Sequence, residues 1–257
     1  MSKKPSPSEE ADRLLRLLWR HTLGEPAGAR GPRQGITVDE VVRASIALAD
    51  REGLAAVSMR KLAEALGVGV MTLYTYVPGK DDLVALMVDE VEGEVEPPGP
   101  SGGLRDRLAA MAESLWDEYR RHPWLLDVGD LRFAPGPNGS ERFEWQLALI
   151  EGLGLDDIEM DQTVAAITGF TASCARAALQ MQRIQERSGM SDARWWEINA
   201  PILAEVMPAD RYPIAERVGT TAGTTYNAAS DPGRTFRFGL ERILDGLEGL
   251  VSSRSGS

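Results

Sequence analysis

Hydrophobic residues recur at spacings of three and four along most of this chain. Three runs carry the pattern most clearly: Leu104, Leu108, Met111, Leu115 and Tyr119; Val164, Ile167, Thr171, Cys174, Ala178 and Met181; and Phe236, Leu240, Ile243, Leu247 and Leu250. A period near 3.6 places such residues on one face of an α-helix, whereas a half-buried strand needs strict alternation. No segment shows a convincing alternation, so the sequence predicts an all-α protein.

Segments rich in glycine and proline divide the chain into a small and a large helical domain. The large domain contains a segment rich in Pro, Gly, Thr and Ala, residues 207–233, which we expect to form a long loop. The expected domains are an N-terminal extension with a basic arm (1–35), a compact helical domain (36–91), a Pro/Gly linker (92–103) and a larger helical domain (104–252).

Charge is distributed unevenly between these parts. The net charge is −11, yet residues 1–82 hold 12 Lys/Arg against 11 Asp/Glu, while residues 83–257 hold 16 against 28. A near-neutral small domain beside an acidic large one is typical of a protein whose small domain alone contacts nucleic acid. The alternative is that the acidic residues only keep the protein soluble.

Composition indicates a soluble protein that can bury a substantial core. The chain has 257 residues, and no apolar run approaches the roughly 20 residues that span a bilayer. There is no signal-peptide pattern, and the single cysteine excludes an intrachain disulfide framework. We therefore expect a cytoplasmic location.

Helix boundaries are clearest in residues 36–91. Thr37 and Glu40 have the spacing of a capping box, and they predict a helix from Val38 to about Arg51. From Ser58 to Val91 the pattern is helical, with interruptions at the glycine of position 67 and at the Pro-Gly pair 78–79.

Residues 59–78 fulfil the requirements of a helix-turn-helix unit, in which two helices cross at a tight turn. Ala63 is small enough for the crossing, and Gly67 suits the turn. The inward positions are apolar or aromatic: Leu62, Leu66, Val68, Leu73 and Tyr76. The second helix, about residues 70–76, would then lie in the DNA major groove. An ordinary helical hairpin is the alternative.

The stretch from Ser58 to Leu83, SMRKLAEALGVGVMTLYTYVPGKDDL, resembles the DNA-binding domain of the tetracycline-repressor (TetR) family. Residues 121–125 (RHPWL) and 236–247 look like the ligand-binding and dimerisation domain of the tetracycline-repressor branch. The resemblance implies a homodimeric transcription regulator that binds double-stranded operator DNA and, as a repressor, is released by a small organic effector. A ligand-independent regulator or activator is the alternative.

The resemblance and the chemistry of the side chains together suggest the DNA contacts. Hydroxyls at helix starts suit phosphates, although they can serve as plain N-caps as well. Arg60 has the geometry to reach a guanine edge, or is an exposed helix charge. Val70 and Met71 are apolar, so we expect them to contact thymine methyl groups. The arm, with Arg30 and Arg33, would enter the minor groove or be a solubilising tail. The expected DNA-binding residues are Arg33, Thr37, Ser58, Arg60, Lys61, Val70, Met71, Thr72, Tyr74, Thr75, Tyr76 and Lys80.

The resemblance gives the C-terminal helices two roles, dimerisation and effector binding. Helices 161–187 and 234–251 are the interface candidates, and the first has small residues suited to close helix approach: Ala166, Gly169, Ser173 and Ala177. Packing within one chain is the alternative. Large or soft side chains on expected interior faces either line a pocket or belong to the core. The candidates are Trp116, Trp124, Trp145, Phe170, Cys174 and Met181.

Motifs of catalysis and of metal or cofactor binding are not evident in the sequence. There is no G-x-S-x-G, P-loop or H-E-x-x-H pattern, so we expect no enzyme and no cofactor. The magnesium-dependent tetracycline site of the family needs histidines, and only His122 lies in the C-terminal domain. A neutral or cationic organic effector is therefore the expectation, because acidic surroundings and tryptophan faces suit cations.

Overall fold

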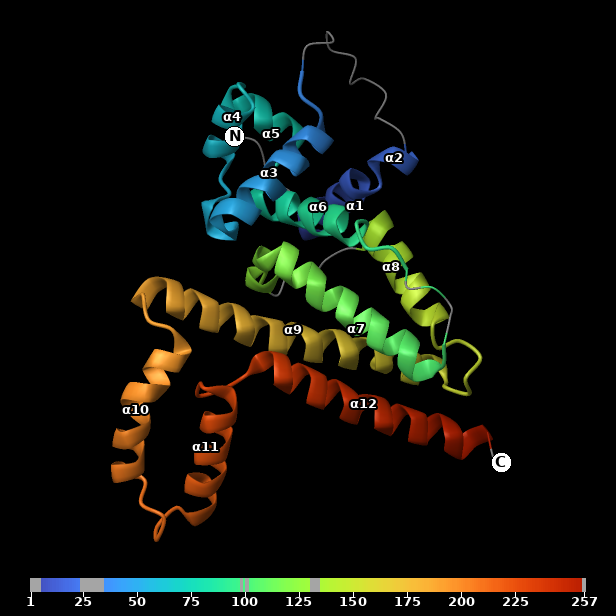
Figure 1. Cartoon of the computed structure of the whole chain (residues 1–257). Helices are drawn as coiled ribbons and strands as arrows, with labels where there is room; N and C mark the ends of the chain where they lie inside the picture. Colours follow the sequence, from blue (N-terminus) through green and yellow to red (C-terminus); the bar gives the residue numbers. More distant parts are fainter. Residues whose placement is uncertain (1–5, 24–34, 98, 100–101, 130–134, 256–257) are drawn as a thin grey trace. The chain divides into compact units, whose positions relative to one another are not determined.

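The computed structural model describes residues 6–23, 35–97, 99, 102–129 and 135–255 (Figure 1). Within these ranges the regular elements are α-helices and two short 3₁₀ helices, with no strand. The prediction of an all-α protein is confirmed. The chain divides into two compact units, residues 1–164 and 165–257, and the division falls inside one long helix. The functional domain boundaries expected from the sequence, with the small domain ending at residue 91 and the larger one beginning at residue 104, stay a prediction.

The first unit holds the N-terminal helices, the helix-turn-helix and the start of the larger region. Its helices are α1 (Pro7–Leu18), α2 (Arg20–Leu23), α3 (Val38–Glu52), α4 (Met59–Ala65), α5 (Val70–Tyr76), α6 (Lys80–Glu92), α7 (Leu104–Arg121), α8 (Pro137–Ala148) and the first residues of α9 (Asp157–Ser188), with 3₁₀ helices Leu54–Ala56 and Pro123–Asp127.

Capping groups explain where the helices of the small domain begin and end. The Thr37 hydroxyl accepts the Glu40 N–H, while the Glu40 carboxylate accepts the Thr37 N–H, so the predicted capping box is present. The Ser58 hydroxyl accepts the Lys61 N–H at the start of α4. Gly53 ends α3 with a φ of 81°, a conformation that a side chain would disfavour. The sequence therefore predicted these boundaries from local chemistry alone.

One hydrophobic core joins the helix-turn-helix to its flanking segments. Leu62 and Leu73 of the motif are fully buried in it, together with Leu83 of α6 and Leu18 of α1. The Arg13 guanidinium also pairs with Asp82 at 3.1 Å, and the Trp19 indole N–H donates to the Pro135 carbonyl at 3.0 Å. The N-terminal helices are thus part of the folded domain, whereas the basic arm with Arg30 and Arg33 lies outside the described residues.

The second unit contains most of α9 followed by α10 (Asp192–Val206), α11 (Pro213–Tyr226) and α12 (Pro232–Ser255). The expectation of a long loop over residues 207–233 is wrong, because α11 occupies much of it. Pro213 stands in the first turn of α11, where its fixed φ favours a helix start. The Trp196 ring of α10 packs against the backbone of Gly223 in α11, within 1.8 Å of where a side chain would begin. This tertiary contact buries Gly223 alone in α11, a helix whose many Gly and Thr residues favour a loop on propensity.

Candidate DNA interface and effector region

The α4–α5 pair has the geometry of a helix-turn-helix (Figure 1). Gly67 has a φ of 69°, which turns the chain between the two helices, and the Val68 N–H donates to the Ala63 carbonyl at 2.9 Å. Ala63 is buried at the crossing. Leu66, Val68 and Tyr76 are partly buried and pack on the core. The residues predicted to face inward therefore do so.

The second helix of the motif, α5, presents a mixed apolar and hydroxyl surface to solvent. Met71 is 78% exposed, and Val70 and Tyr74 are exposed as well. Thr72 and Thr75 are also exposed, and the Thr75 hydroxyl donates to the Thr72 carbonyl at 2.6 Å. Such a surface matches the methyl groups of thymine better than the hydrogen-bonding edge of guanine.

The cationic candidates differ in their surroundings. Arg60 is exposed on α4, and no ion pair of its side chain occurs among the described residues. The Lys80 ammonium donates to the Leu54 carbonyl at 3.3 Å. Lys61 pairs with Glu52 of α3 at 2.9 Å, so its ammonium is directed towards α3 rather than along the exposed face of α5.

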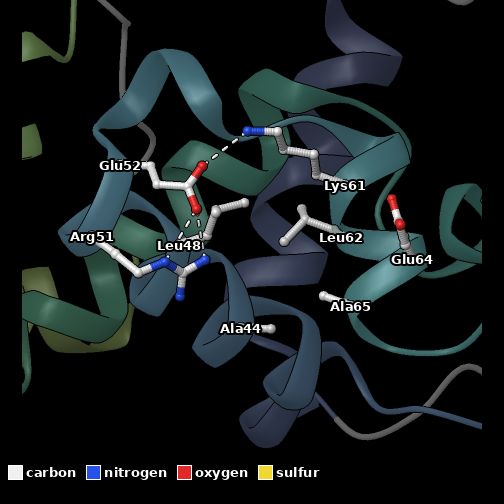
Figure 2. A pocket seen from close by; sticks show the side chains of 8 residues that line it. All are labelled: Ala44, Leu48, Arg51, Glu52, Lys61, Leu62, Glu64 and Ala65. Carbon is white, nitrogen blue, oxygen red and sulfur yellow. Dashed lines mark hydrogen bonds and ion pairs between the residues drawn. The ribbon is translucent and has the colours of Figure 1, made fainter.

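Figure 2 shows that this ion pair closes one side of a groove between α3 and α4. Glu52 accepts from Lys61 on one side and from Arg51 on the other. The hydrogen bond from Lys61, reinforced by Arg51, lowers the pKa of Glu52. The groove has a volume of about 330 Å³ and is lined by Ala44, Leu48, Arg51, Glu52, Lys61, Leu62, Glu64 and Ala65.

The helix α6 connects the helix-turn-helix to α8 through a buried carboxylate. Asp89 accepts the backbone N–H of Gly139 at 3.0 Å and the side-chain amide of Asn138 at 3.4 Å, both in the first turn of α8. Its oxygens fill the space where a side chain at Gly136 would lie. Burial raises the pKa of Asp89 in spite of these hydrogen bonds. Asp89 thus anchors the end of α6 to the start of α8.

A buried ion pair continues this connection to α7. The Arg142 guanidinium of α8 forms two hydrogen bonds with Glu118 of α7, at 2.8 and 2.6 Å. The same guanidinium donates to the Glu92 carbonyl at the end of α6, at 3.0 Å. Burial, opposed by Arg142, raises the pKa of the Glu92 carboxyl to about 7. Together with Asp89, the residues Glu92, Glu118 and Arg142 are called the α6–α8 network below. None of the four was predicted from the sequence. The available signal was Glu118, a charged residue on the buried helix face that carries Met111 and Leu115.

His122 and Trp124 meet on one carboxylate of α3. His122 contacts Asp50 at 2.8 Å through Nδ1 and Glu94 at 3.0 Å through Nε2, while the Trp124 indole donates to Asp50 at 2.8 Å. Trp124 is 1% exposed and belongs to the hydrophobic core of the small domain. Of the six pocket candidates, it is the one that the structure places in the core around the DNA-binding helices.

Three other candidates, Phe170, Cys174 and Met181, lie on one face of α9. The Phe170 ring stacks on Phe236 of α12, with centroids 6.3 Å apart and planes 15° from parallel. Burial raises the pKa of the Cys174 thiol, and the Ser230 hydroxyl lies 3.4 Å from the Met181 sulfur. The remaining two, Trp116 of α7 and Trp145 of α8, are partly exposed in the first unit.

The described residues contain neither a candidate membrane-spanning helix nor a candidate metal site. None of the described helices is long and apolar enough to cross a membrane. No group of three or more His, Cys, Asp or Glu residues in the described ranges is placed to hold a metal ion.

A helix-turn-helix with an exposed second helix, followed by a larger helical region, defines a DNA-binding regulator. The profile described as "Bacterial regulatory proteins, tetR family" matches residues 41–87, and that described as "Tetracyclin repressor-like, C-terminal domain" matches residues 96–251. The chain belongs to the TetR family of transcriptional regulators. The resemblance noted in residues 58–83 and in the C-terminal region is thereby confirmed.

Named relatives and solved structures agree with this assignment. The chain is 41% identical to the transcriptional repressor DrrR1 of Streptomyces coeruleorubidus, over 99% of this chain and 92% of DrrR1. It is 33% identical to a transcriptional regulator of Saccharopolyspora erythraea, over 68% and 76% of the two chains. ActR of Streptomyces coelicolor, solved in complex with actinorhodin, is 27% identical, with a TM-score of 0.67 over 84% of this chain and 99% of ActR. ActR has also been solved with (S)-DNPA.

Proposed function

We propose that this protein is a dimeric repressor that binds operator DNA through α4 and α5 and is released by a small organic effector. The relative DrrR1 is named a repressor, and ActR is solved with two different small molecules. The observation that carries the proposal is the α6–α8 network. It connects the helix that follows the DNA-reading unit to α7 and α8, so a shift of those helices displaces α6.

Base reading is assigned to the exposed side of α5. Val70 and Met71 would contact thymine methyl groups, with Thr72 beside them, while Tyr74 and Thr75 contact the phosphate backbone. The phosphate contacts at helix starts fall to Thr37 and Ser58, whose hydroxyls are exposed and also serve as caps. Arg60, Tyr76, Lys80 and, from the arm, Arg33 complete the proposed set. Lys61 takes part only if it leaves Glu52.

Dimerisation is assigned to α9 and α12. The small residues of α9 named above, at 166, 169, 173 and 177, are all exposed. Apart from the backbone of α9 itself, no atom of the described residues lies within 4 Å of a side chain added at Gly169. Phe238 of α12 is exposed as well. Exposed apolar side chains also occur along α10 and α11, at Trp195, Ile198, Ile202, Val206, Ile214 and Val218. Contiguous exposed apolar surface marks interaction sites in soluble proteins, and a second subunit would cover it.

Effector binding is assigned to the region that matches the tetracycline-repressor C-terminal profile. A neutral or cationic organic molecule suits it better than a magnesium complex, because the one histidine in this region, His122, is held by Asp50 and Glu94. A regulator of this kind acts on DNA in the cytoplasm.

The test is a measurement of reciprocal coupling with the full-length protein. An operator is first selected from random duplex DNA, and its affinity is then measured with and without actinorhodin. A coupling free energy of about 1–3 kcal/mol would weaken operator binding roughly 5–150-fold, and operator DNA must weaken effector binding by the same factor. If operator affinity is unchanged by an effector that binds, the protein is a constitutive DNA binder.

A further inference from the structure

Two acidic side chains of α6 occupy two glycine positions at the start of α8. Asp89 and Glu92 are three residues apart, and so are Gly136 and Gly139. The Asp89 oxygens fill the space of a side chain at Gly136, and Oε2 of Glu92 lies 2.5 Å from where a side chain at Gly139 would begin. Residues three apart lie on one face of a helix. The same face of α6 therefore directs both carboxyls against the start of α8.

The two carboxyls differ in their hydrogen bonds. Asp89 accepts two hydrogen bonds from the first turn of α8, and these compensate its negative charge. The Glu92 carboxyl makes no hydrogen bond or ion pair among the described residues, although the Glu92 backbone carbonyl accepts from Arg142. The Glu92 side chain is partly buried. Burial of a carboxylate without a partner favours the neutral acid.

The surroundings of Glu92 carry more negative than positive charge. Asp89 of α6 and Glu118 of α7 oppose ionisation of Glu92, while Arg142 of α8 favours it. The guanidinium of Arg142 is already engaged, because two of its nitrogens donate to the carboxylate of Glu118. When Glu92 is charged, one guanidinium faces three carboxylates across the contact between α6, α7 and α8.

These conditions make the contact between α6 and α8 sensitive to protons. Burial raises the pKa of Glu92 to about 7, and the nearby carboxylates add to this effect. Ionisation of Glu92 leaves an uncompensated negative charge between the helices, so repulsion favours their separation. Two outer groups act on other members of the network: Arg20 of α2 on Asp89, and Tyr119 of α7 on Arg142.

We propose that Glu92 makes operator binding respond to pH: its neutral carboxyl allows α6 to pack on α8 in the operator-binding arrangement, and its ionisation separates the two helices and weakens operator binding. This inference rests on the proposed function. The packed arrangement belongs to the effector-free protein, which is the form proposed to bind the operator. Ionisation of Glu92 therefore acts in the same direction as an effector.

The sign and size of the response follow from the two arrangements. Separation of the helices returns Glu92 to water, where its pKa has the ordinary value of 4.5. Between pH 4.5 and about 7 the packed arrangement binds more protons than the separated one, so it becomes less favourable as the pH rises. One such proton changes the ratio of packed to separated protein by up to about tenfold between pH 6 and pH 8.

The first experiment needs no DNA and measures amide hydrogen exchange of the full-length protein at pH 6 and pH 8, corrected for the intrinsic exchange rates. In the wild type, α6 and α8 should lose up to about tenfold in protection at pH 8. Glu92→Gln keeps a neutral side chain of the same shape, so its protection should be equal at both pH values. The exposed Glu113→Gln of α7 is the control and should behave as the wild type does. Equal protection in the wild type, or the same loss in Glu92→Gln, would overturn the inference.

The second experiment measures operator affinity at the same two pH values and at constant ionic strength. Histidine protonation strengthens DNA binding in general at low pH, and Glu92→Gln retains both histidines of the chain. The fall in affinity from pH 6 to pH 8 should be up to about tenfold larger in the wild type than in Glu92→Gln. At pH 8 the variant should bind the operator more tightly than the wild type. An equal fall in the two proteins would overturn the inference.

The two experiments together separate this inference from the proposed function. If exchange depends on Glu92 but operator affinity does not, the contact between α6 and α8 does not control DNA binding, and the inference fails while the repressor proposal stands. If the wild type binds no selected operator at either pH, the proposed function fails and this inference fails with it.

Discussion

Glu92 shows how burial alters one carboxyl at the centre of the α6–α8 network. Its pKa is raised to about 7, mainly because burial removes the charged form from water, and Arg142 offsets only part of this. The unfolded chain has the ordinary value of 4.5. Between these two values the folded protein binds more protons than the unfolded one, so the free energy of unfolding falls as the pH rises from about 4.5 to 7.

Replacing Glu92 by glutamine should remove this penalty. We expect Glu92→Gln to be more stable than the wild type at pH 8 by about 1–3 kcal/mol, with little difference at pH 4.5. The measurement is denaturant unfolding at the two pH values, with the exposed Glu113→Gln of α7 as control. A variant that is less stable at pH 8 would mean that the Glu92 charge stabilises the network through Arg142.

Val70 and Met71 test whether α5 reads bases. The double variant Val70→Ala, Met71→Ala should weaken binding to the selected operator by about 1–3 kcal/mol per lost base contact, while binding to random DNA changes little. Lys80→Ala is the comparison, because loss of a phosphate contact should weaken binding to all DNA alike and reduce the salt slope by about one unit. If the ratio of specific to non-specific affinity is the same in the double variant and in the wild type, Val70 and Met71 do not read bases.

At the scale of elements, α10 and α11 meet at a close contact between the Trp196 ring and the backbone of Gly223. Gly223→Ala would place a methyl group inside the Trp196 ring, so α10 and α11 must move apart. We expect a loss of about 1–3 kcal/mol in unfolding free energy and faster amide hydrogen exchange in both helices. Gly219→Ala is the matched control, because no described atom outside the backbone of α11 lies within 4 Å of a side chain there and alanine favours the helix. Equal behaviour of the two variants would show that the contact does not hold the hairpin.

The N-terminal helices illustrate how an extension becomes part of a domain. Leu18 supplies a buried side chain to the core of the small domain, and Arg13 pairs with Asp82 of α6. Arg20 and His21 both contact Asp39 in the first turn of α3. Burial raises the pKa of the Asp39 carboxyl, whereas the hydrogen bond and charge of Arg20 lower it, and the net pKa is lowered. These contacts join α1 and α2 to two helices that follow the arm.

At the scale of the whole molecule, the proposed dimer predicts the effect of a bulky residue on α9. Gly169→Trp should shift the protein from dimer to monomer in sedimentation analysis, because a large side chain keeps the two helices apart. Operator affinity should fall with it, since two linked reading units bind far more tightly than one. A dimer of unchanged stability would direct the search for the interface to α10 and α11.

Local chemistry in the sequence determined most of the DNA-binding domain. The Thr37–Glu40 capping box, the positive φ of Gly67 and the inward set around Leu62 and Leu73 depend on residues close together in the chain, so spacing and residue type were sufficient. The periodic apolar runs likewise determined that the protein is helical, and the family pattern identified the regulator.

Only the tertiary structure decided the features that depend on distant residues. The pair of Glu118 with Arg142, the bond from Trp124 to Asp50 and the packing of Trp196 on Gly223 each join separate helices. The helix over part of residues 207–233 was not predicted either, because its Gly and Thr residues favour a loop on propensity and its contact with Trp196 joins it to another helix.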